Sequence, residues 1–274
     1  MAQALRHFLL AIQFFSRIPV TGRLAAWVGY SPAMLRASAA HFPGVGVVVG
    51  GLVTLATAAL LAVLPPGPFS PLVAAVLGAV LSVLVTGGFH EDGLADVADG
   101  LGGSYDRERA LVIMKDSRVG AFGVLAVVLA LLAKVALLAL ICSVSGAWML
   151  AGIFAAHVVS RTWPLLTIRL LAHVGDAAGS KSKPLADQIG GRSLLAGGLW
   201  CFGALALVGL AQGAMVSGAV DWQPLAGGVL SSALAWAYMA RLLWRRLQGF
   251  TGDGLGATQQ VCEIAFYLGL ALAL

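Results

Sequence analysis

The sequence predicts an all-α integral membrane protein, a polytopic helix bundle that forms a single domain over residues 1–274. Hydrophobic residues make up 59% of the chain and charged residues 11%, whereas about a quarter of the residues in a typical soluble domain are charged. The apolar residues gather in long runs, and a helix needs roughly 20 of them to cross a bilayer. We therefore expect about seven transmembrane helices, preceded by an N-terminal helix that lies in the membrane interface.

The first three elements follow from the lengths of the apolar runs. Residues 5–15 are too few to span a bilayer easily, and basic side chains flank them, so an amphipathic interfacial helix is expected. The first span is expected over 43–64, where prolines at 65, 66 and 68 end it. A second and shorter apolar run covers 71–86.

The remaining spans form two hairpins and a short final helix. The helix that begins at 147 is expected to continue through Arg161 and to kink or end at Pro164. The last helix contains Glu263, which is costly in a membrane unless it is paired, so it is expected to reach the site or Arg245 or Arg246. The expected spans are 122–144, 147–160, 194–220, 225–244 and 261–274.

The basic residues orient these helices. With the N-terminus inside, the segments 1–42, 87–121, 161–193 and 241–259 share one side and carry 16 of the 17 Lys and Arg residues. The remaining one, Lys134, lies within a span. Short loops rich in Lys and Arg stay in the cytoplasm. We therefore expect a multi-pass protein of the cytoplasmic (inner) membrane, with its active-site loops on the cytoplasmic face.

One segment, residues 87–123, contains seven of the twelve carboxylates of the chain. Asp92, Asp96 and Asp99 are spaced i, i+4, i+7, so in a helix they form one stripe on one face. Like charges at this spacing repel one another, which favours a bound cation. An all-oxygen cluster suits Mg²⁺, which is often shared with substrate phosphates. The alternative is a solvated helix face.

Two further segments supply cations on the same side. Lys115 and Arg118 alternate with Asp116 directly after buried positions, so they could hold a diphosphate while Asp116 completes the metal shell. The alternative is a topology anchor near the lipid headgroups. The 161–193 loop is rich in Gly, Ser and Lys, which suggests a mobile lid with cations for an anionic substrate, or else a positively charged linker.

Two residues are candidates for proton transfer. His90 precedes the Asp stripe by two residues and could act near neutral pH, although a single histidine is more often structural. Asp253 lies in a glycine-dense turn before the last helix, on the same side as the stripe. It could be a second carboxylate donor, a general base, or simply a helix N-cap.

Five blocks of the sequence resemble a known enzyme family, the cobalamin-5′-phosphate synthases, also called adenosylcobinamide-GDP ribazoletransferases. The two most specific blocks are HEDGLADVADGL at 90–101 and IMKDSRVG at 113–120. The others are TGDGLGA at 251–257, AIQFFSRIPV at 11–20 and HFPGVG at 41–46.

The resemblance implies a reaction of vitamin B12 synthesis. The 5′ oxygen of α-ribazole, or of its 5′-phosphate, would attack adenosylcobinamide-GDP with Mg²⁺ present, releasing GMP and giving adenosylcobalamin or its 5′-phosphate. The expected partners are these substrates and the lipid bilayer, without nucleic acid, and a homo-oligomer is compatible with the sequence. The implied roles are Mg²⁺ ligands at Asp92, Asp96, Asp99 and Asp116, substrate contacts at Lys115, Arg118, Arg161 and Lys181, and deprotonation of the nucleophile by His90 or Asp253.

Two other classes of function are alternatives to this interpretation. The Asp stripe also resembles the motif of the CDP-alcohol phosphotransferases, which make lipids. Their Ala-Arg step after Asp-Gly is replaced here by Ala95-Asp96, which counts against a lipid synthase. A cation transporter normally carries its ionisable groups near the bilayer midplane on broken helices. Here nearly all of these groups are expected at one surface, which counts against transport.

Overall fold

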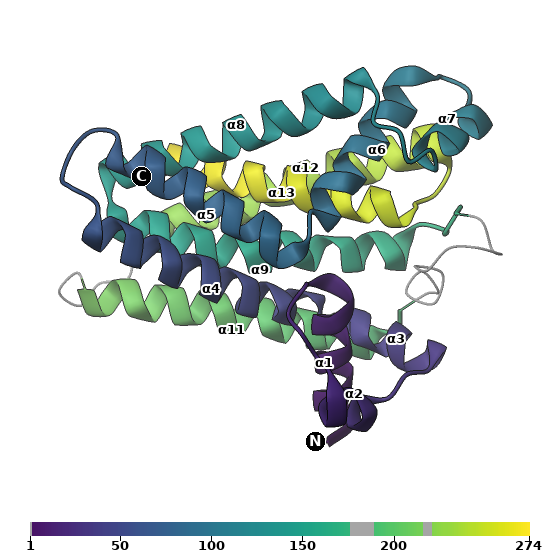
Figure 1. The fold of residues 1–274 in the computed structure, drawn as a ribbon, viewed down its shortest axis with the longest axis horizontal. Coiled ribbons are helices and arrows are strands. Elements are labelled where there is room, and N and C mark those ends of the chain that lie inside the picture. The colour runs from purple at the N-terminus through teal and green to yellow at the C-terminus, as the bar shows by residue number, and fades with distance from the viewer. Residues whose placement is uncertain (1, 176–188, 216–220) are drawn as a thin grey trace.

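The computed structural model describes residues 2–175, 189–215 and 221–274, and in these ranges the chain is a helix bundle without a β-sheet (Figure 1). An isolated bridge between His173 and Phe250 is the β-type pairing found in this part of the chain. The all-α prediction is therefore confirmed. The long helices are α4 (Phe42–Val63), α5 (Ser70–Thr86), α8 (Ala121–Val144), α9 (Gly146–Leu170), α11 (Gly191–Met215), α12 (Gln223–Leu247) and α13 (Gly252–Leu272).

Fewer helices qualify as membrane spans than the seven expected. In the described residues, four stretches are long and apolar enough to cross a bilayer: Pro32–Val63, Ala121–Val144, Gly146–Leu170 and Gly191–Ala214. A fifth arises if α5 and the next helix, α6 (Phe89–Gly103), are counted as one span bent by 90°. The membrane-bundle class is thus supported, while the count of seven is not confirmed. We treat α6 as lying outside the spans, because it has only 15 residues and is rich in carboxylates.

The polar segments gather at one end of the bundle. In Figure 1, α6, α7 (Arg107–Met114) and the turn from α12 into α13 lie at one end, whereas the α4–α5 connection and the C-terminus lie at the other. Asp106 caps α7 by accepting a hydrogen bond from the Arg109 backbone N–H over 2.8 Å. Of the three apolar residues expected on the inner face of this helix, Leu111 and Met114 are buried and Ile113 is only partly buried.

The N-terminal region is more helical than its apolar pattern suggests. The helix predicted near the N-terminus is present as α1 (Ala2–Phe15), and three short elements follow it. Its location in the membrane interface stays a prediction. Ser31 begins one of them by accepting a hydrogen bond from the Met34 N–H over 3.1 Å. These elements are α2 (Gly22–Val28), α3 (Pro32–Ser38) and the 3₁₀ turn η1 (Ala39–His41).

Helix α9 corrects one predicted boundary. It runs without interruption past Pro164 to Leu170, so the proline does not end it. Arg161, expected at the start of a cytoplasmic loop, is instead 1% exposed inside the bundle. The neighbouring helices bury this part of α9, and a proline within a packed helix is tolerated when its surroundings hold the helix together.

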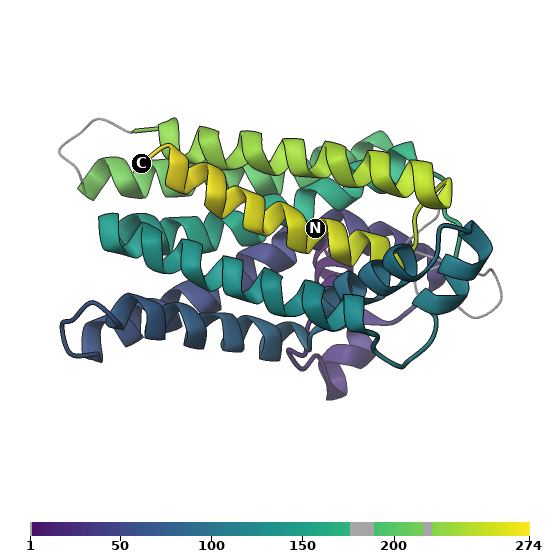
Figure 2. The same cartoon turned by 90° about the horizontal axis from the view of Figure 1, so that it is seen from above.

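Helix α13 corrects a second boundary. It begins at Gly252, well before the predicted start at 261, because Thr251 caps it by accepting a hydrogen bond from the Gly254 N–H over 3.1 Å. Asp253 is therefore in the first turn and is not the N-cap. Figure 2 shows α13 alongside α12, and it also packs against α6, α8 and α9. This central position makes α13 the helix that connects the acidic segment to the interior of the bundle.

Candidate active site

A sharp elbow between α5 and α6 positions the acidic stripe. Gly87 and Gly88 have φ values of 71° and 70°, a left-handed conformation that glycine adopts without steric cost. Two such residues in succession turn the chain by 90°. The segment after α1 is fastened to this elbow, because the Arg17 N–H donates to the Val85 carbonyl over 2.7 Å.

The predicted stripe forms on α6, and its members differ in exposure. Asp92 is exposed, Asp96 is partly buried and Asp99 is 9% exposed. Asp253 of α13 lies against the same helix: a Cβ at Gly93 would be 2.8 Å from the Asp253 carbonyl oxygen. The structure thus brings Asp253 beside the stripe, as its position in the sequence led us to expect.

These carboxylates perturb one another. Burial, followed by repulsion from Asp253, Asp92 and Asp99, raises the pKa of Asp96 to about 7. Burial and Asp92 raise the pKa of Asp253 to about 6, although a hydrogen bond with Thr251 opposes the shift. A carboxylate whose charged form is disfavoured in this way gains from a nearby cation. A cation near Asp92, Asp96 and Asp253 would therefore relieve the repulsion among them.

Asp99 has a different environment from the rest of the stripe. Its carboxylate oxygens accept hydrogen bonds from the backbone N–H groups of Gly120 and Gly123, over 2.7 and 2.8 Å. These groups belong to the N-terminal end of α8, where free N–H donors and the helix dipole favour a negative charge. Asp99 thus fastens α6 to α8. Its role as a metal ligand stays a prediction.

Asp116 forms a local pair with Arg118. The Arg118 guanidinium donates to both carboxylate oxygens over 2.5–3.1 Å. These hydrogen bonds lower the pKa of Asp116 to about 2. Arg118 is 87% exposed, so the pair lies at the surface of the loop that follows α7. The metal and phosphate roles expected for Asp116, Lys115 and Arg118 also stay predictions.

The structure describes no complete metal-binding group. Within residues 2–175, 189–215 and 221–274, no three side chains of His, Cys, Asp or Glu are close enough together to hold a metal ion as they stand. Asp92, Asp96 and Asp253 are near enough to shift one another's pKa, but their carboxyl groups do not converge on one point.

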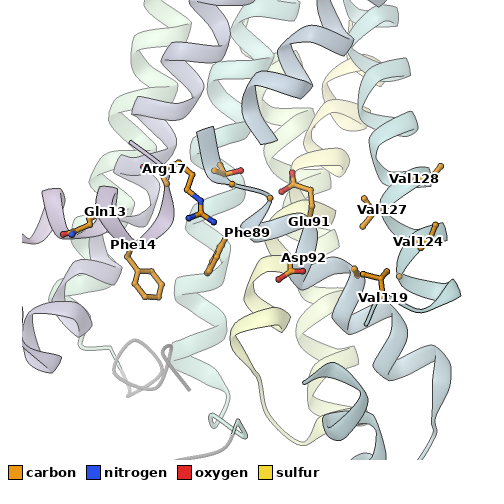
Figure 3. A pocket seen from close by; sticks show the side chains of 16 residues that line it. Gln13, Phe14, Arg17, Phe89, Glu91, Asp92, Val119, Val124, Val127 and Val128 are labelled. Carbon is orange, nitrogen blue, oxygen red and sulfur yellow. The ribbon is translucent and has the colours of Figure 1, made fainter. Parts of the chain in front are cut away.

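A cavity of about 730 Å³ opens beside the stripe. Asp92 and Glu91 of α6 lie in its wall, with Arg17 on one side and valines of α8 on the other (Figure 3). Its wall is therefore charged on the α6 side and aliphatic on the α8 side. On the aliphatic side, α8 contributes Gly123, Val124, Val127 and Val128, and the loop before α8 contributes Val119.

Sequence reasoning missed two charged residues of this cavity. By its position, Arg17 is expected only to flank the interfacial helix, although it belongs to the block 11–20 that carries the family resemblance. Glu91 adjoins Asp92 but is off the i, i+4, i+7 stripe, so helical spacing did not select it. Both residues lie in blocks that carry the family resemblance, 11–20 and 90–101, and this position in the sequence could have identified them.

His90 and Arg161 lie elsewhere. His90 is 1% exposed and its ring stacks on Phe42 with 5.7 Å between centroids. It lines a separate apolar pocket of about 40 Å³, and neither ring nitrogen has a hydrogen-bond partner among the described residues. Arg161 lies over the same Phe42 ring and bonds to His157 over 2.9 Å. Their roles in proton transfer and substrate binding stay predictions, and Lys181 lies outside the described residues.

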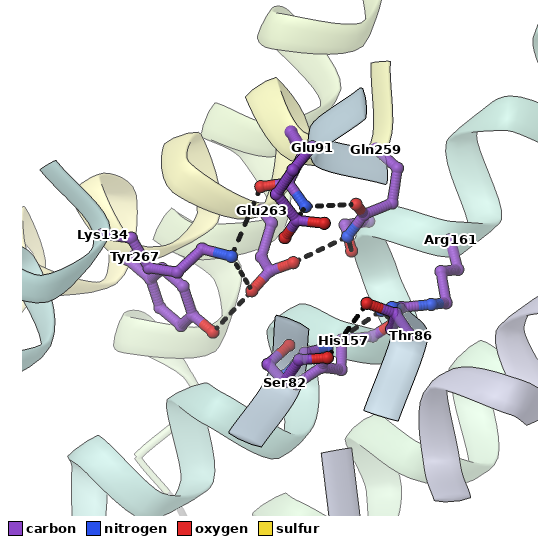
Figure 4. A network of polar contacts seen from close by, with 11 residues as sticks. Ser82, Thr86, Glu91, Lys134, His157, Arg161, Gln259, Glu263 and Tyr267 are labelled. Carbon is purple, nitrogen blue, oxygen red and sulfur yellow. Dashed lines mark hydrogen bonds and ion pairs between the residues drawn. The ribbon is translucent and has the colours of Figure 1, made fainter. Parts of the chain in front are cut away.

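A buried polar network extends from the cavity wall into the bundle (Figure 4). Its ion pair joins Lys134 of α8 to Glu263 of α13 over 3.1 Å. The sequence predicts that Glu263 reaches the site or Arg245 or Arg246, and the pairing with either arginine is wrong. Lys134 neutralises it because α8 packs directly against α13.

Comparisons with a family model and with known proteins point to the same family. A family model described as cobalamin-5-phosphate synthase matches residues 7–271. A protein from Albidiferax ferrireducens, named adenosylcobinamide-GDP ribazoletransferase, is 69% identical over the full length of both chains. Proteins of the same name from Polaromonas naphthalenivorans and Vibrio cholerae are 60% and 40% identical, covering 100% and 98% of this chain and 100% and 95% of theirs. No solved structure matches the chain.

Proposed function

Because the chain belongs to the cobalamin-5-phosphate synthase family, we propose that it joins α-ribazole, or its 5′-phosphate, to adenosylcobinamide-GDP and releases GMP. The family resemblance seen in the sequence blocks is confirmed, and the chain is a transferase of cobalamin synthesis.

The observation that supports the proposal most strongly is the meeting of α6 and α13 beside the cavity. Asp92 and Asp96 come from a segment far from Asp253 in the chain. Burial, followed by repulsion from neighbouring carboxylates, raises the pKa of Asp96 to about 7 and of Asp253 to about 6. We assign Asp92 and Asp96 to hold Mg²⁺. When bound there, Mg²⁺ would stabilise negative charge on the transferring and leaving oxygens.

The phosphates of adenosylcobinamide-GDP need positive charge from the protein as well. Arg17 lines the cavity on the opposite side from the α8 valines, and a guanidinium binds phosphate oxygens through paired hydrogen bonds. We therefore place Arg17 with Lys115 and Arg118 as the groups that hold the diphosphate.

The attacking oxygen of α-ribazole must lose its proton. As the new O–P bond forms and the P–O bond to GMP breaks, the proton would pass to Asp253, whose pKa of about 6 lies close to neutral pH. With α-ribazole 5′-phosphate the attacking oxygen belongs to the phosphate and carries its own negative charge. Asp253 is preferred over His90 because it lies close enough to Asp92 and Asp96 to interact with them electrostatically, whereas His90 is buried in an apolar pocket.

The location in the cell is part of the proposal. We place the site at the cytoplasmic face of the inner membrane, with α5, α12 and the part of α13 from residue 261 onward completing about seven spans. Apart from Lys134 and Arg161, which are buried inside the bundle, the Lys and Arg residues are expected on one side, and this supports the orientation.

One assay tests the proposed function. Purified protein in detergent or nanodiscs is given adenosylcobinamide-GDP, α-ribazole and Mg²⁺, and GMP release is measured. GMP release that depends on both substrates supports the proposal. Absence of GMP release together with CMP release from a CDP-alcohol would instead establish a lipid-type phosphotransferase.

A further inference from the structure

Glu91 stands where the cavity meets the buried network. It is 8% exposed and lines the cavity beside Asp92. One carboxylate oxygen, Oε1, accepts a hydrogen bond from the Gln260 side-chain amide over 3.0 Å. The other, Oε2, is buried and has no hydrogen-bond partner in the described part of the chain. A buried carboxylate oxygen without a donor is costly, so this atom is suited to a ligand that supplies one.

Gln260 holds Glu91 in one orientation. Its Oε1 accepts from the Lys134 ammonium over 3.4 Å, and its Nε2 donates to Glu91 over 3.0 Å and to the Gln259 Oε1 over 3.1 Å. Rotating the amide by 180° would turn its NH₂ group toward the ammonium and its oxygen toward a carboxylate. Both contacts would then be repulsive, so the amide has one stable direction.

The ion pair fixes the far end of this chain of contacts. Glu263 accepts from Lys134 over 3.1 Å, from Gln259 over 2.6 Å and from Tyr267 over 3.1 Å. Lys134 and Glu263 are 3% and 1% exposed, and buried charges of this kind are held in place by their partners. The rigid interior is therefore connected to the cavity wall through Gln260.

We infer that Glu91 is a further substrate-contacting residue, with Oε2 accepting a hydrogen bond from a ribose hydroxyl, and that Gln260 is its positioning residue. The inference rests on the proposed function, since it takes the cavity as the site of a ribosyl substrate. A carboxylate repels phosphate oxygens, which are drawn instead toward Arg17 across the cavity. Hydroxyl groups are the donors that a ribosyl substrate presents next to its phosphate. Both the acceptor and the guanosine diphosphate group carry a ribose.

Binding measurements separate these two sources and do not depend on turnover. The dissociation constants of α-ribazole and of GDP are measured by calorimetry without Mg²⁺, for the wild type and for Glu91→Gln. A hydrogen bond to a charged group predicts weakening of about tenfold or more. If α-ribazole binds more weakly, the hydroxyl that contacts Glu91 belongs to the acceptor. If GDP binds more weakly, it belongs to the guanosine. If the Glu91→Gln protein binds both as the wild type does, or the wild type binds neither, the inference is wrong. GMP release by the wild type is assayed separately and reports on the proposed function alone.

The positioning role is tested by a double-mutant cycle. Gln260→Met should weaken the same ligand as Glu91→Gln, and should have little further effect in the Glu91→Gln background, because Gln260 acts through Glu91. Gln212→Met is the matched control: Gln212 is also buried on a long helix and donates one hydrogen bond, to the Ala147 carbonyl over 3.1 Å. It should lower the melting temperature without changing either dissociation constant.

Two results would remove the positioning role. In the first, the fold-changes in dissociation constant of Gln260→Met and Glu91→Gln multiply in the double variant. In the second, Gln212→Met weakens binding as much as Gln260→Met does. Should Gln260→Met fail to fold, Gln260→Asn keeps an amide that is one methylene too short to reach both neighbours. It should then weaken binding, and wild-type binding by the Asn variant would count against the inference.

Discussion

The raised pKa values of Asp96 and Asp253 make Mg²⁺ binding depend on pH. With pKa values of about 7 and about 6, Asp96 is about nine-tenths ionised at pH 8 and about one-tenth ionised at pH 6, while Asp253 falls from nearly complete to half ionisation. Asp96 is an assigned ligand and the charge of Asp253 acts on it, so a cation is favoured most when both are ionised. The affinity for Mg²⁺ should then fall about 20-fold between pH 8 and pH 6.

The number of protons released when Mg²⁺ binds measures the same coupling between metal binding and carboxylate ionisation directly. At pH 7 Asp96 is about half protonated and Asp253 about one-tenth protonated, so binding of Mg²⁺ should release about 0.6 proton. Calorimetry in buffers of different ionisation enthalpy gives this number. In Asp96→Asn the release should fall to about 0.1 proton, because Asp253 alone then titrates near pH 7. Binding without proton release, or with equal affinity at pH 6 and pH 8, would refute the assignment of the metal to these carboxylates.

The metal-free protein should show the opposite dependence in its stability. The folded pKa of Asp96 and Asp253 lies above the ordinary value of 3.8, so the folded state binds more protons than the unfolded state between about pH 4 and pH 7. Stability is then greatest at the acidic end of this window and falls as the pH rises through it. The melting temperature in detergent with EDTA should therefore drop toward pH 8. Mg²⁺ should restore it, and a melting temperature that rises across this window would contradict the shifts.

Three further substitutions test separate contacts. Asp92→Asn should abolish GMP release while membrane insertion stays intact, and near-normal turnover would remove the metal-site argument. Asp99→Ala should lower the free energy of unfolding by about 1–3 kcal/mol, measured in SDS titrations, because two backbone N–H groups of α8 lose their acceptor. Lys134→Met should cost about 3–5 kcal/mol by leaving Glu263 buried without a cation, and adding Glu263→Gln should recover much of it. Equal stability of Lys134→Met and the double variant would show that the unpaired Glu263 carboxylate is not the source of the cost.

Local properties of the sequence predicted the fold class and the acidic helix. The length of an apolar run and the spacing of side chains at 3.6 residues per turn depend only on neighbouring residues. For that reason the all-α class and the helix that carries Asp92, Asp96 and Asp99 could be read from the sequence. The gathering of the polar segments at one end followed from the basic residues, which mark loops wherever they occur.

The ends of helices were less predictable, because they depend on caps and on packing. Helix α13 begins at Gly252 since Thr251 caps it, although the apolar run starts only near Val261. Helix α9 continues beyond Pro164 because neighbouring helices bury it, and this places Arg161 inside the bundle. Neither outcome is contained in the apolar pattern alone.

The class of protein, the acidic helix and the family can all be predicted from the sequence, because they depend on local composition, spacing and motifs. The tertiary structure alone decided what each polar residue faces. The elbow at Gly87 and Gly88 and the packing of α13 turn Glu91 toward the cavity and His90 toward an apolar pocket, although the two are adjacent in the chain. The physical reason is that neighbours on a helix point about 100° apart, so the packed surroundings of each side chain, which come from distant segments, determine its role.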